Sequence, residues 1–563
     1  MPESNPISRR IIWPIALALA AFAQEKVTPT PAKQSFRITG TVVSALTAQP
    51  LAHTEVEIGW ALKSETEQSL VTTDDGQFQF DGLPPGKYWL RAARNGFSRQ
   101  GFDEHDGYFT GIVVGPGLQS ADLIFRLRPD ASISGMITDE QNELVRDVQV
   151  MLFRSGIENG RRATTLQGQV SSNDQGRYRF SHLSPGTYFV AVSARPWYAQ
   201  GLEQRGRRVR GRVRGVQPPE GEPDIVPPNP ALDVAYPLSY YSGATEANSA
   251  TPIVLKAGDR ASADVGLTAV HALTLRIHDP SVSPGQPFGA TLEQHVFEGR
   301  TIPVPQENAQ TRKGEIDISG LPPGEFVVNV QSFGKDNNNA KDTHGWTQTI
   351  SLSSDADITA PAAGTASAPI TGVVTLGGMP PGRRAYIQLR SRASGNTLGA
   401  EVSPKGEFEI PPSEVRPGTY QVSVTNLPES IVASVAASGA KVLGQSVVIT
   451  GAGPVQLTVT MSEGLATVTG IAMKDEKPSG GVMIVLVPQD PENNAALFRR
   501  DQSDSDGSFN LRQVLPGKYT ALAIENGWDL EWANPSVLKP YIKDGEAVDI
   551  SGSRKYEVKL KVQ

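Results

Sequence analysis

One phrase occurs five times along this chain and constrains its fold more than any other feature. A glycine is followed by apolar residues two and four positions later, then by Pro-Gly, and then by an aromatic residue two positions after that second glycine. The first copy runs from Gly76 through Phe78 and Phe80 to Pro85-Gly86 and Tyr88. The paired glycines of the other copies are Gly176 and Gly186, Gly314 and Gly324, Gly406 and Gly418, and Gly507 and Gly517. Such long-period repetition predicts an array of similar structural units.

Each phrase predicts two strands joined as a hairpin. Apolar residues alternate at Phe78, Phe80, Tyr88 and Leu90, which is the two-residue period of a strand with one buried side. Pro-Gly suits the two central positions of a type II turn, since proline presets the first φ and glycine accepts the positive φ of the second. We therefore interpret Gly76, Gly86, Gly176, Gly186, Gly324, Gly418, Gly507 and Gly517 as structural turn residues. The acidic residues before some of them favour turns over calcium loops, which need more ligands.

Further short strands on both sides of each phrase complete a unit of about 100 residues, the length of one β-sandwich. An opening strand containing one glycine precedes four of the phrases, at 36–42, 133–137, 370–374 and 468–471. The predicted fold is all-β, a tandem array of about five antiparallel β-sandwich modules. Modules 1 to 5 are expected at 35–129, 130–270, 271–360, 368–463 and 464–563. Module 3 is the most divergent, because 271–279 lacks the opening glycine.

The order of these signals resembles the carboxypeptidase regulatory-like domain family. The family signature is the opening strand with glycine, then T/S-[DN]-x-x-G-x-[FY]-x-[FIL], then [LV]-x-P-G-x-[YF]-x-[VL], and it covers nearly all of residues 35–563. The resemblance implies a transthyretin-like (prealbumin-like) or starch-binding-like β-sandwich, related to Cna-type collagen-adhesin repeats. Because the signature consists mainly of turns and core residues, it implies a fold and leaves the function to be argued from individual sites.

The N-terminus predicts export. Ser8-Arg9-Arg10 forms a basic region, Ile11 to Ala20 is apolar, and Ala21-Phe22-Ala23 is a cleavage site, so residues 1–23 are interpreted as a signal peptide. The alternative is an uncleaved anchor, although this apolar stretch is shorter than the roughly 20 residues that span a bilayer. We expect a periplasmic, extracellular or cell-surface protein with no transmembrane segment after cleavage.

Charge and cysteine content narrow the possible partners. The formal net charge of −7 over 563 residues argues against a nucleic-acid partner. The chain has no cysteine, which removes disulfides, thiolate nucleophiles and a lipidated anchor.

An insertion at 195–250 interrupts module 2. It starts with Trp197 and Tyr198, and ends after a proline-rich stretch at 218–230. Between them lie six arginines, Arg205, Arg207, Arg208, Arg210, Arg212 and Arg214, which could bind an acidic polysaccharide or a phosphate. The competing interpretation is a solvated loop, since blocks of like charge are often disordered.

Several tryptophans are candidates for a carbohydrate platform, because an exposed ring face can stack on a sugar. The candidates are Trp89, Trp197, Trp346, Trp528 and Trp532. Trp89 alternates out of phase with Tyr88 and Leu90 and is therefore expected to face solvent. A core position is the alternative for each of them.

No complete catalytic motif is present in the sequence. His295 and Glu298 match the His-x-x-Glu pair of zinc carboxypeptidases, but a zinc site needs three or four converging ligands, and the flanking sequence predicts strands. His-Glu-x-x-His, Gly-x-Ser-x-Gly and phosphate-binding motifs are absent from the sequence. We predict no catalytic residues, no metal ion and no cofactor.

Repetition without catalytic chemistry predicts an exported, non-catalytic binding or scaffolding protein of the cell envelope. The expected partner is a polysaccharide or an envelope protein, bound through several modules so that modest affinities multiply. Two alternatives stay open: an accessory or cryptic hydrolase, and a purely structural stalk whose linkers near Pro361 to Pro369 set the spacing.

Overall fold

The computed structural model describes residues 35–563 apart from 62–65, 119, 200–229, 281, 283–287, 298–299, 305–308, 313–314, 333–344, 361–367, 383, 392–396, 412–414, 416, 428–429, 451–452 and 464. The predicted signal peptide (1–23), most of the predicted linker 361–369 and the predicted binding residues Arg205, Arg207, Arg208 and Arg210 lie outside the described residues. The described strands form five pairs of sheets, one pair after another along the chain, and one further two-stranded sheet. The predicted all-β fold is confirmed.

The strands of modules 1 and 2 occupy the first half of the chain. Module 1 contains β1 (Phe36–Ser44), β2 (Glu55–Trp60), β3 (Gln68–Val71), β4 (Gln77–Leu83), β5 (Gly86–Arg94), β6 (Phe97–Gly101), β7 (Ile112–Val114) and β8 (Leu123–Leu127). Module 2 contains β9 (Ala131–Thr138), β10 (Gln149–Glu158), β11 (Arg161–Ser171), β12 (Arg177–Leu183), β13 (Gly186–Ser193), η1 (Pro230–Leu232), β14 (Val234–Ala235), β15 (Ser239–Tyr240), η2 (Ala247–Ser249), β16 (Ile253–Leu255), β17 (Arg260–Ser262) and β18 (Val265–Gly266).

Modules 3 to 5 follow the same order of strands. Module 3 contains β19 (Val270–His271), β20 (Leu273–His278), β21 (Phe288–His295), β22 (Thr301–Pro303), β23 (Ala309–Arg312), β24 (Glu315–Leu321), β25 (Gly324–Ser332), β26 (Gly345–Leu352) and β27 (Ala356–Thr359). Module 4 contains β28 (Ile370–Leu376), β29 (Ala385–Ser391), β30 (Thr397–Val402), β31 (Glu407–Ile410), β32 (Gly418–Thr425), β33 (Ile431–Ser438), β34 (Lys441–Leu443), β35 (Ser446–Ile449) and β36 (Val455–Ser462). Module 5 contains β37 (Ala466–Lys474), β38 (Lys477–Pro478), β39 (Met483–Pro488), η6 (Ala495–Leu497), β40 (Arg499–Gln502), β41 (Ser508–Val514), β42 (Gly517–Ile524), η7 (Gly527–Asp529), α2 (Pro535–Ile542), β43 (Glu546–Ile550) and β44 (Lys555–Lys561).

Each module stacks two sheets built on one plan. In the first sheet the opening strand lies between an antiparallel and a parallel neighbour, as in β4-β1-β8 and β31-β28-β36. The second sheet is antiparallel, as in β3-β2-β5-β6 and β40-β39-β42-β43. Apolar side chains that alternate along the strands meet between the sheets in a separate core for each module. The parallel pair was not predicted, because alternation shows which face is buried and not the strand direction.

The predicted hairpin at Pro-Gly is wrong. β4 and β5 belong to different sheets of module 1, so Pro85-Gly86 carries the chain across the core from one sheet to the other. Gly186, Gly418 and Gly517 have φ of +158°, +158° and +156°, whereas a type II turn needs about +80°. A hairpin and a crossing between sheets both bury one side of each strand, so the alternation could not distinguish them.

The tyrosine of the phrase stabilises this crossing between the sheets through a hydrogen bond. The hydroxyl of Tyr88 donates to the carbonyl of Pro84 at 2.9 Å, and Tyr519 donates to the carbonyl of Leu515 at 3.0 Å. Tyr188 makes the equivalent bond in module 2, at 2.7 Å. Each ring is buried in the core while its hydroxyl satisfies a carbonyl of the crossing, as in the tyrosine corners of other sandwiches.

The glycine of the opening strand leaves room for an aromatic ring. A Cβ at Gly470 would lie 2.0 Å from the carbonyl oxygen of Val558 in the parallel strand and 2.8 Å from the ring of Phe509. Module 3 replaces both members of this pair, since Ile277 lies opposite Ile316. Module 3 therefore forms the same sheet, with two isoleucines at the positions of the glycine and the aromatic residue.

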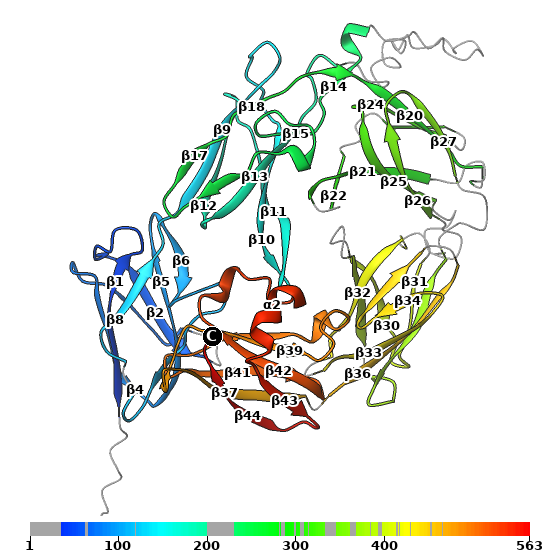
Figure 1. Ribbon diagram of the computed structural model, residues 1–563. Coiled ribbons are helices and arrows are strands. Elements are labelled where there is room, and N and C mark those ends of the chain that lie inside the picture. The colour runs from blue at the N-terminus through cyan, green and yellow to red at the C-terminus, as the bar shows by residue number, and fades with distance from the viewer. Residues whose placement is uncertain are drawn as a thin grey trace, which may run out of the picture.

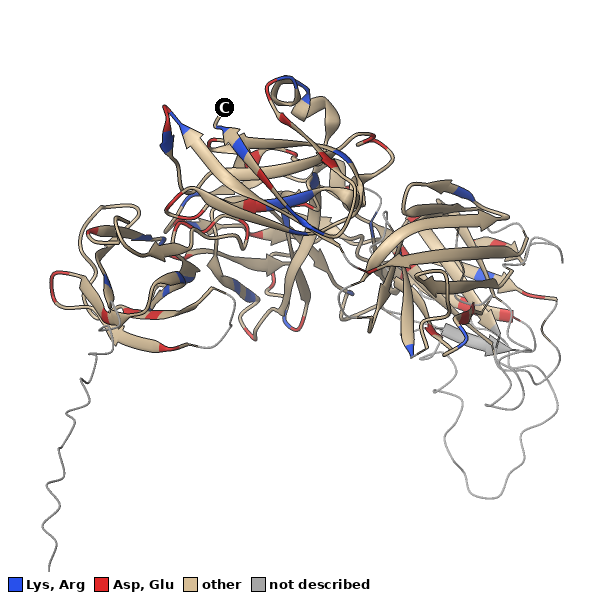
Figure 2. Ribbon diagram, turned by 90° about the horizontal axis from the view of Figure 1, so that it is seen from below, with Lys and Arg blue, Asp and Glu red and all other residues tan. Residues whose placement is uncertain are grey.

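The five modules follow one another around a closed ring, and module 5 returns to lie beside module 1 (Figure 1). Module 2 joins module 3 through the pairing of β14 with β19 and through an apolar cluster. In this cluster the ring of Phe297 packs against Phe153, Phe189 and Tyr240, with ring centroids 4.7 to 5.6 Å apart. Basic and acidic residues are interspersed along the ribbon (Figure 2).

The β10–β11 hairpin of module 2 extends to the region where the other modules meet. Its tip, residues 158–162, contacts three modules. The carboxylate of Glu158 accepts hydrogen bonds from Arg300 of module 3 and, at 3.3 Å, from Arg390 of module 4. The amide of Ala533 in module 5 donates to the carbonyl of Gly160 at 2.9 Å. The hairpin tip therefore connects modules 2, 3, 4 and 5 directly.

Candidate functional site

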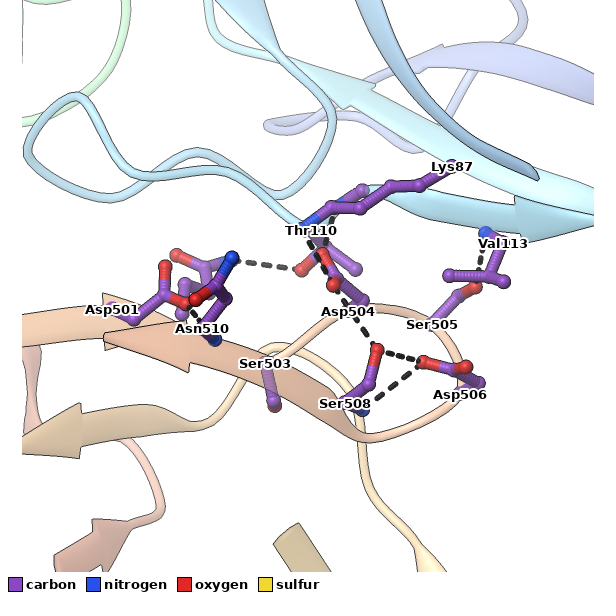
Figure 3. A network of polar contacts seen from close by, with 12 residues as sticks. Lys87, Thr110, Val113, Asp501, Ser503, Asp504, Ser505, Asp506, Ser508 and Asn510 are labelled. Carbon is purple, nitrogen blue, oxygen red and sulfur yellow. Dashed lines mark hydrogen bonds and ion pairs between the residues drawn. The ribbon is translucent and has the colours of Figure 1, made fainter. Parts of the chain in front are cut away.

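Modules 1 and 5 meet through a network of polar groups (Figure 3). The carboxylate of Asp504, in the turn between β40 and β41, lies 2.6 Å from the Nζ of Lys87 on β5 and accepts the amide of Gly111 at 3.2 Å. The Ser505 hydroxyl accepts the amide of Val113 at 2.9 Å, and the Ser505 amide donates to the carbonyl of Gly111 at 2.9 Å. Side chains and main chain thus close the ring together.

The turn that carries Asp504 recurs in the other modules. Thr73, Asn173 and Ser403 occupy the same turn position, and each side-chain oxygen accepts the amide four residues later, at 3.1, 2.8 and 3.1 Å. In module 5 the Asp504 carboxylate accepts the hydroxyl of Ser508 at 3.2 Å and also reaches module 1. A turn residue common to the repeat has thereby become part of a contact between modules.

The environment of Asp504 favours its neutral form. Burial raises the pKa of this carboxyl from 3.8 to about 6, because its side chain is only 3% exposed, while Lys87 acts in the opposite direction. Burial likewise raises the pKa of Asp501 on β40. The closed interface therefore takes up a proton at mildly acidic pH.

Aromatic rings surround a buried arginine beside this network. The guanidinium of Arg500 lies over the rings of Tyr108, Trp528 and Trp532, at 4.7, 5.0 and 5.5 Å from their centroids. The side chain of Arg500 is 3% exposed and faces Asp106 at 3.5 Å. The rings of Trp528 and Trp532, predicted to form a sugar platform, hold Arg500 at the contact between modules 1 and 5.

Trp89 is buried, so the expectation that it faces solvent is wrong. It lies two residues from Lys87 along β5, and therefore on the same side of the strand, which is the side facing Asp504. Alternation predicts an exposed position on this side of β5, but the guanidinium of Arg91 lies over the Trp89 ring, 4.9 Å from its centroid. Trp346 is also buried, and its indole donates to Asp279 at 2.9 Å.

A cleft of about 320 Å³ lies between modules 2 and 3, where the insertion leaves and rejoins module 2. Module 2 contributes Arg146, Asp147, Val148, Gln149, Ser193, Ala194, Arg195, Ala235, Tyr236 and Leu238. Module 3 contributes Gln294, Ile302, Pro303, Val304, Ile318, Ser319, Gly320, Leu321 and Pro322. The hydroxyl oxygen of Ser319 is buried and has no hydrogen-bond partner in the part of the chain that the structure describes. A cleft of this size at a boundary between domains is a common place for a small ligand.

One carboxylate holds both ends of the insertion next to this cleft. Glu140 accepts hydrogen bonds from Tyr198, before the undescribed residues 200–229, and from Tyr236, after them, the second at 3.0 Å. The bond to Glu140 raises the pKa of the Tyr198 hydroxyl to about 12. Trp197 lies beside Tyr198 and is 83% exposed, so its ring is available for a ligand.

Only one member of the His-x-x-Glu pair lies among the described residues. His295 ends β21, and Glu298 lies outside the described residues. Among the described residues, no group of three or more His, Asp or Glu side chains could hold a metal ion. In the same part of the chain, no helix is long and apolar enough to cross a membrane.

Fold and contacts together define a protein of repeated β-sandwich modules. Residues 37–127 and 132–205 match the carboxypeptidase regulatory-like domain. These two segments belong to that family, in agreement with the resemblance of the repeated phrase. No curated protein matches the chain.

Solved structures of bacterial proteins, pilins among them, align with the chain at low similarity. The Bacillus anthracis TIE protein is 11% identical, with 95% of this chain and 76% of that chain covered and a TM-score of 0.16. A streptococcal ancillary pilin is 10% identical, with 58% and 100% covered and a TM-score of 0.19. The minor pilin of Streptococcus agalactiae is 11% identical, with 42% and 96% covered and a TM-score of 0.19. At such TM-scores these likenesses carry no argument about function.

Proposed function

We propose that this chain is an exported, non-catalytic scaffolding and binding protein of the cell envelope, with a glycan or an envelope protein as its partner. The observation that carries the proposal is the closed ring. Five sandwich cores are joined by the β10–β11 hairpin tip and by the contact of Lys87 with Asp504. Such a body presents binding surfaces in fixed relative positions, which suits a scaffold.

The ring favours a compact platform over the alternative of an extended stalk. In a linear array each repeat contacts only its neighbours. Here residues about 400 positions apart in the sequence bond directly, such as Gly111 with Asp504. A straight stalk would have to break the whole contact between modules 1 and 5.

The cleft between modules 2 and 3 supports binding over hydrolysis. Glycosidases generally need two carboxyl groups on opposite sides of the scissile bond. Of the described residues lining the cleft, Asp147 alone carries a carboxyl group, and its side chain is 85% exposed. Glu140, behind the cleft wall, already accepts bonds from Tyr198 and Tyr236.

Export and binding are testable together. Mass spectrometry of the protein purified from its host should give a mature chain beginning at Gln24, and small-angle scattering should give a compact particle. The mature chain should then retain a defined glycan or protein from envelope extract. A cytoplasmic full-length chain, or a mature chain that retains nothing from the extract and binds no glycan on an array, would contradict the proposal.

A further inference from the structure

We propose that the cleft between modules 2 and 3 binds a short acidic saccharide, whose carboxylate lies near Arg146 and Arg195 and whose hydroxyl groups pair with Ser319. This inference rests on the proposed binding function and names the ligand of one site. Three features of the cleft carry it: an unpaired buried hydroxyl, the chemistry of its walls, and the charge at its rim.

Ser319 is the first feature. Its side chain is 8% exposed and lines the cleft, and its hydroxyl oxygen has no hydrogen-bond partner among the described residues. A buried polar group without a hydrogen bond destabilises a fold, so natural proteins rarely keep one without a reason. A ligand hydroxyl entering the cleft can both donate to and accept from this oxygen.

The walls combine apolar surface with polar side chains from both modules. Pro303, Val304 and Pro322 of module 3 face Leu238 and Tyr236 of module 2 across the cleft. Gln149, Ser193 and Gln294 add amide and hydroxyl groups on the two sides. A saccharide presents apolar C–H faces and a dense set of hydroxyl groups, so this mixture of ring, proline and amide surfaces suits it.

Among the described residues that line the cleft, two are basic and one is acidic. Arg146 and Arg195 are exposed, and Asp147 is the acidic residue. Arg146 and Asp147 approach at 3.9 Å, with 75% and 85% of their side chains exposed, so water screens this pair and a carboxylate ligand can compete for the guanidinium. The charge therefore selects an acidic sugar over a neutral one.

Calorimetric titration of the mature chain tests the assignment. The probes are an oligogalacturonate, an oligoguluronate and a hyaluronan fragment, each compared with its neutral methyl ester. We expect at least one acidic probe to bind, and its ester to bind about tenfold more weakly, because one charge-assisted contact is lost. Arg146→Gln should remove this preference, while Arg177→Gln, on the exposed side of β12, should leave it intact.

Ser319→Ala separates a binding role from a structural one. We expect affinity to fall about tenfold while the melting temperature stays constant or rises, because the free protein loses a hydroxyl that had no partner. Lower stability together with unchanged affinity would assign Ser319 to the fold and overturn its role in binding.

The remaining outcomes distinguish this inference from the proposed function. Equal binding of acids and esters would overturn the acidic class and leave glycan binding in place. If no saccharide binds but envelope extract still yields a protein partner, the cleft assignment is overturned and the scaffold survives. If neither binds, both proposals fail.

Discussion

The closed ring should respond to pH through Asp504. Its pKa of about 6 lies above the 3.8 of a hydrated carboxyl, so the closed ring binds a proton more tightly than an open state in which module 5 also unfolds and water reaches this carboxyl. The resulting stabilisation is complete below pH 3.8 and is lost as the pH rises through about 6. A shift of about two pKa units corresponds to about 3 kcal/mol, of which about 2 kcal/mol should be present at pH 4.5.

Asp504→Asn removes the titrating group and should flatten this dependence. Native-state hydrogen exchange measures it directly, because the amides of Gly111 and Val113 donate across the interface to Asp504 and Ser505. After correction for intrinsic exchange, the opening free energy at these amides should rise by about 2 kcal/mol more in the wild type than in the variant between pH 7.5 and 4.5. Asp174→Asn, at an exposed position in the corresponding turn of module 2, is the matched control. The reasoning would be refuted if the opening free energies of wild type and Asp504→Asn changed with pH in the same way. It would also be refuted if acidification lowered the opening free energy of the wild type relative to that of the variant.

Three further substitutions test the fold and the ring. Gly470→Ala should destabilise module 5 by about 3 kcal/mol or more in urea unfolding, because its Cβ would meet the carbonyl of Val558 at 2.0 Å. The control Gly552→Ala, with open space around it, should change the stability little. Equal effects of the two substitutions would contradict the packing argument. Gly160→Ala should expose the contact between modules 2 and 5 to proteolysis, since its Cβ would lie 2.4 Å from that of Ala533. Gly96 has a similar positive φ but no atom within 4 Å of the position that a Cβ would take, so Gly96→Ala measures the effect of backbone strain alone. Tyr188→Phe should lower the stability of module 2 by about 1 kcal/mol through loss of the bond to Ser184, and an unchanged unfolding midpoint would show that this bond does not fasten the crossing.

Residues within one module were predictable from the sequence, and contacts between modules were not. The alternation of Phe78, Phe80 and Tyr88 correctly indicated the core of module 1, because a two-residue period reports burial directly. The two-residue period is the same for parallel and antiparallel strands, and the same whether Pro85-Gly86 forms a hairpin or a crossing. The parallel pairs and the crossing between sheets were therefore not predicted.

The candidate sites depend on surfaces that only the assembled ring creates. Asp504 fits a turn motif in the sequence, and nothing local indicates its partner Lys87. Trp89 lies in the phase of its strand that alternation predicts to be exposed, and it is nevertheless buried. Ser319 occupies an ordinary strand position, and its missing partner becomes visible only with both walls of the cleft in place. The insertion at 195–250 was a useful signal, since Arg195 at its start and Tyr236 and Leu238 within it line this cleft.

The contact of module 5 with module 1 changes what the repeat number means for this molecule. An open string of repeats gains or loses a copy at its end with a roughly additive change in stability. A circle has no end, so deleting or duplicating one copy would misplace Asp504 relative to Lys87 and the hairpin tip relative to Arg300 and Arg390. Selection for closure would thus fix the copy number at five while leaving the outward loops of each copy free to diverge.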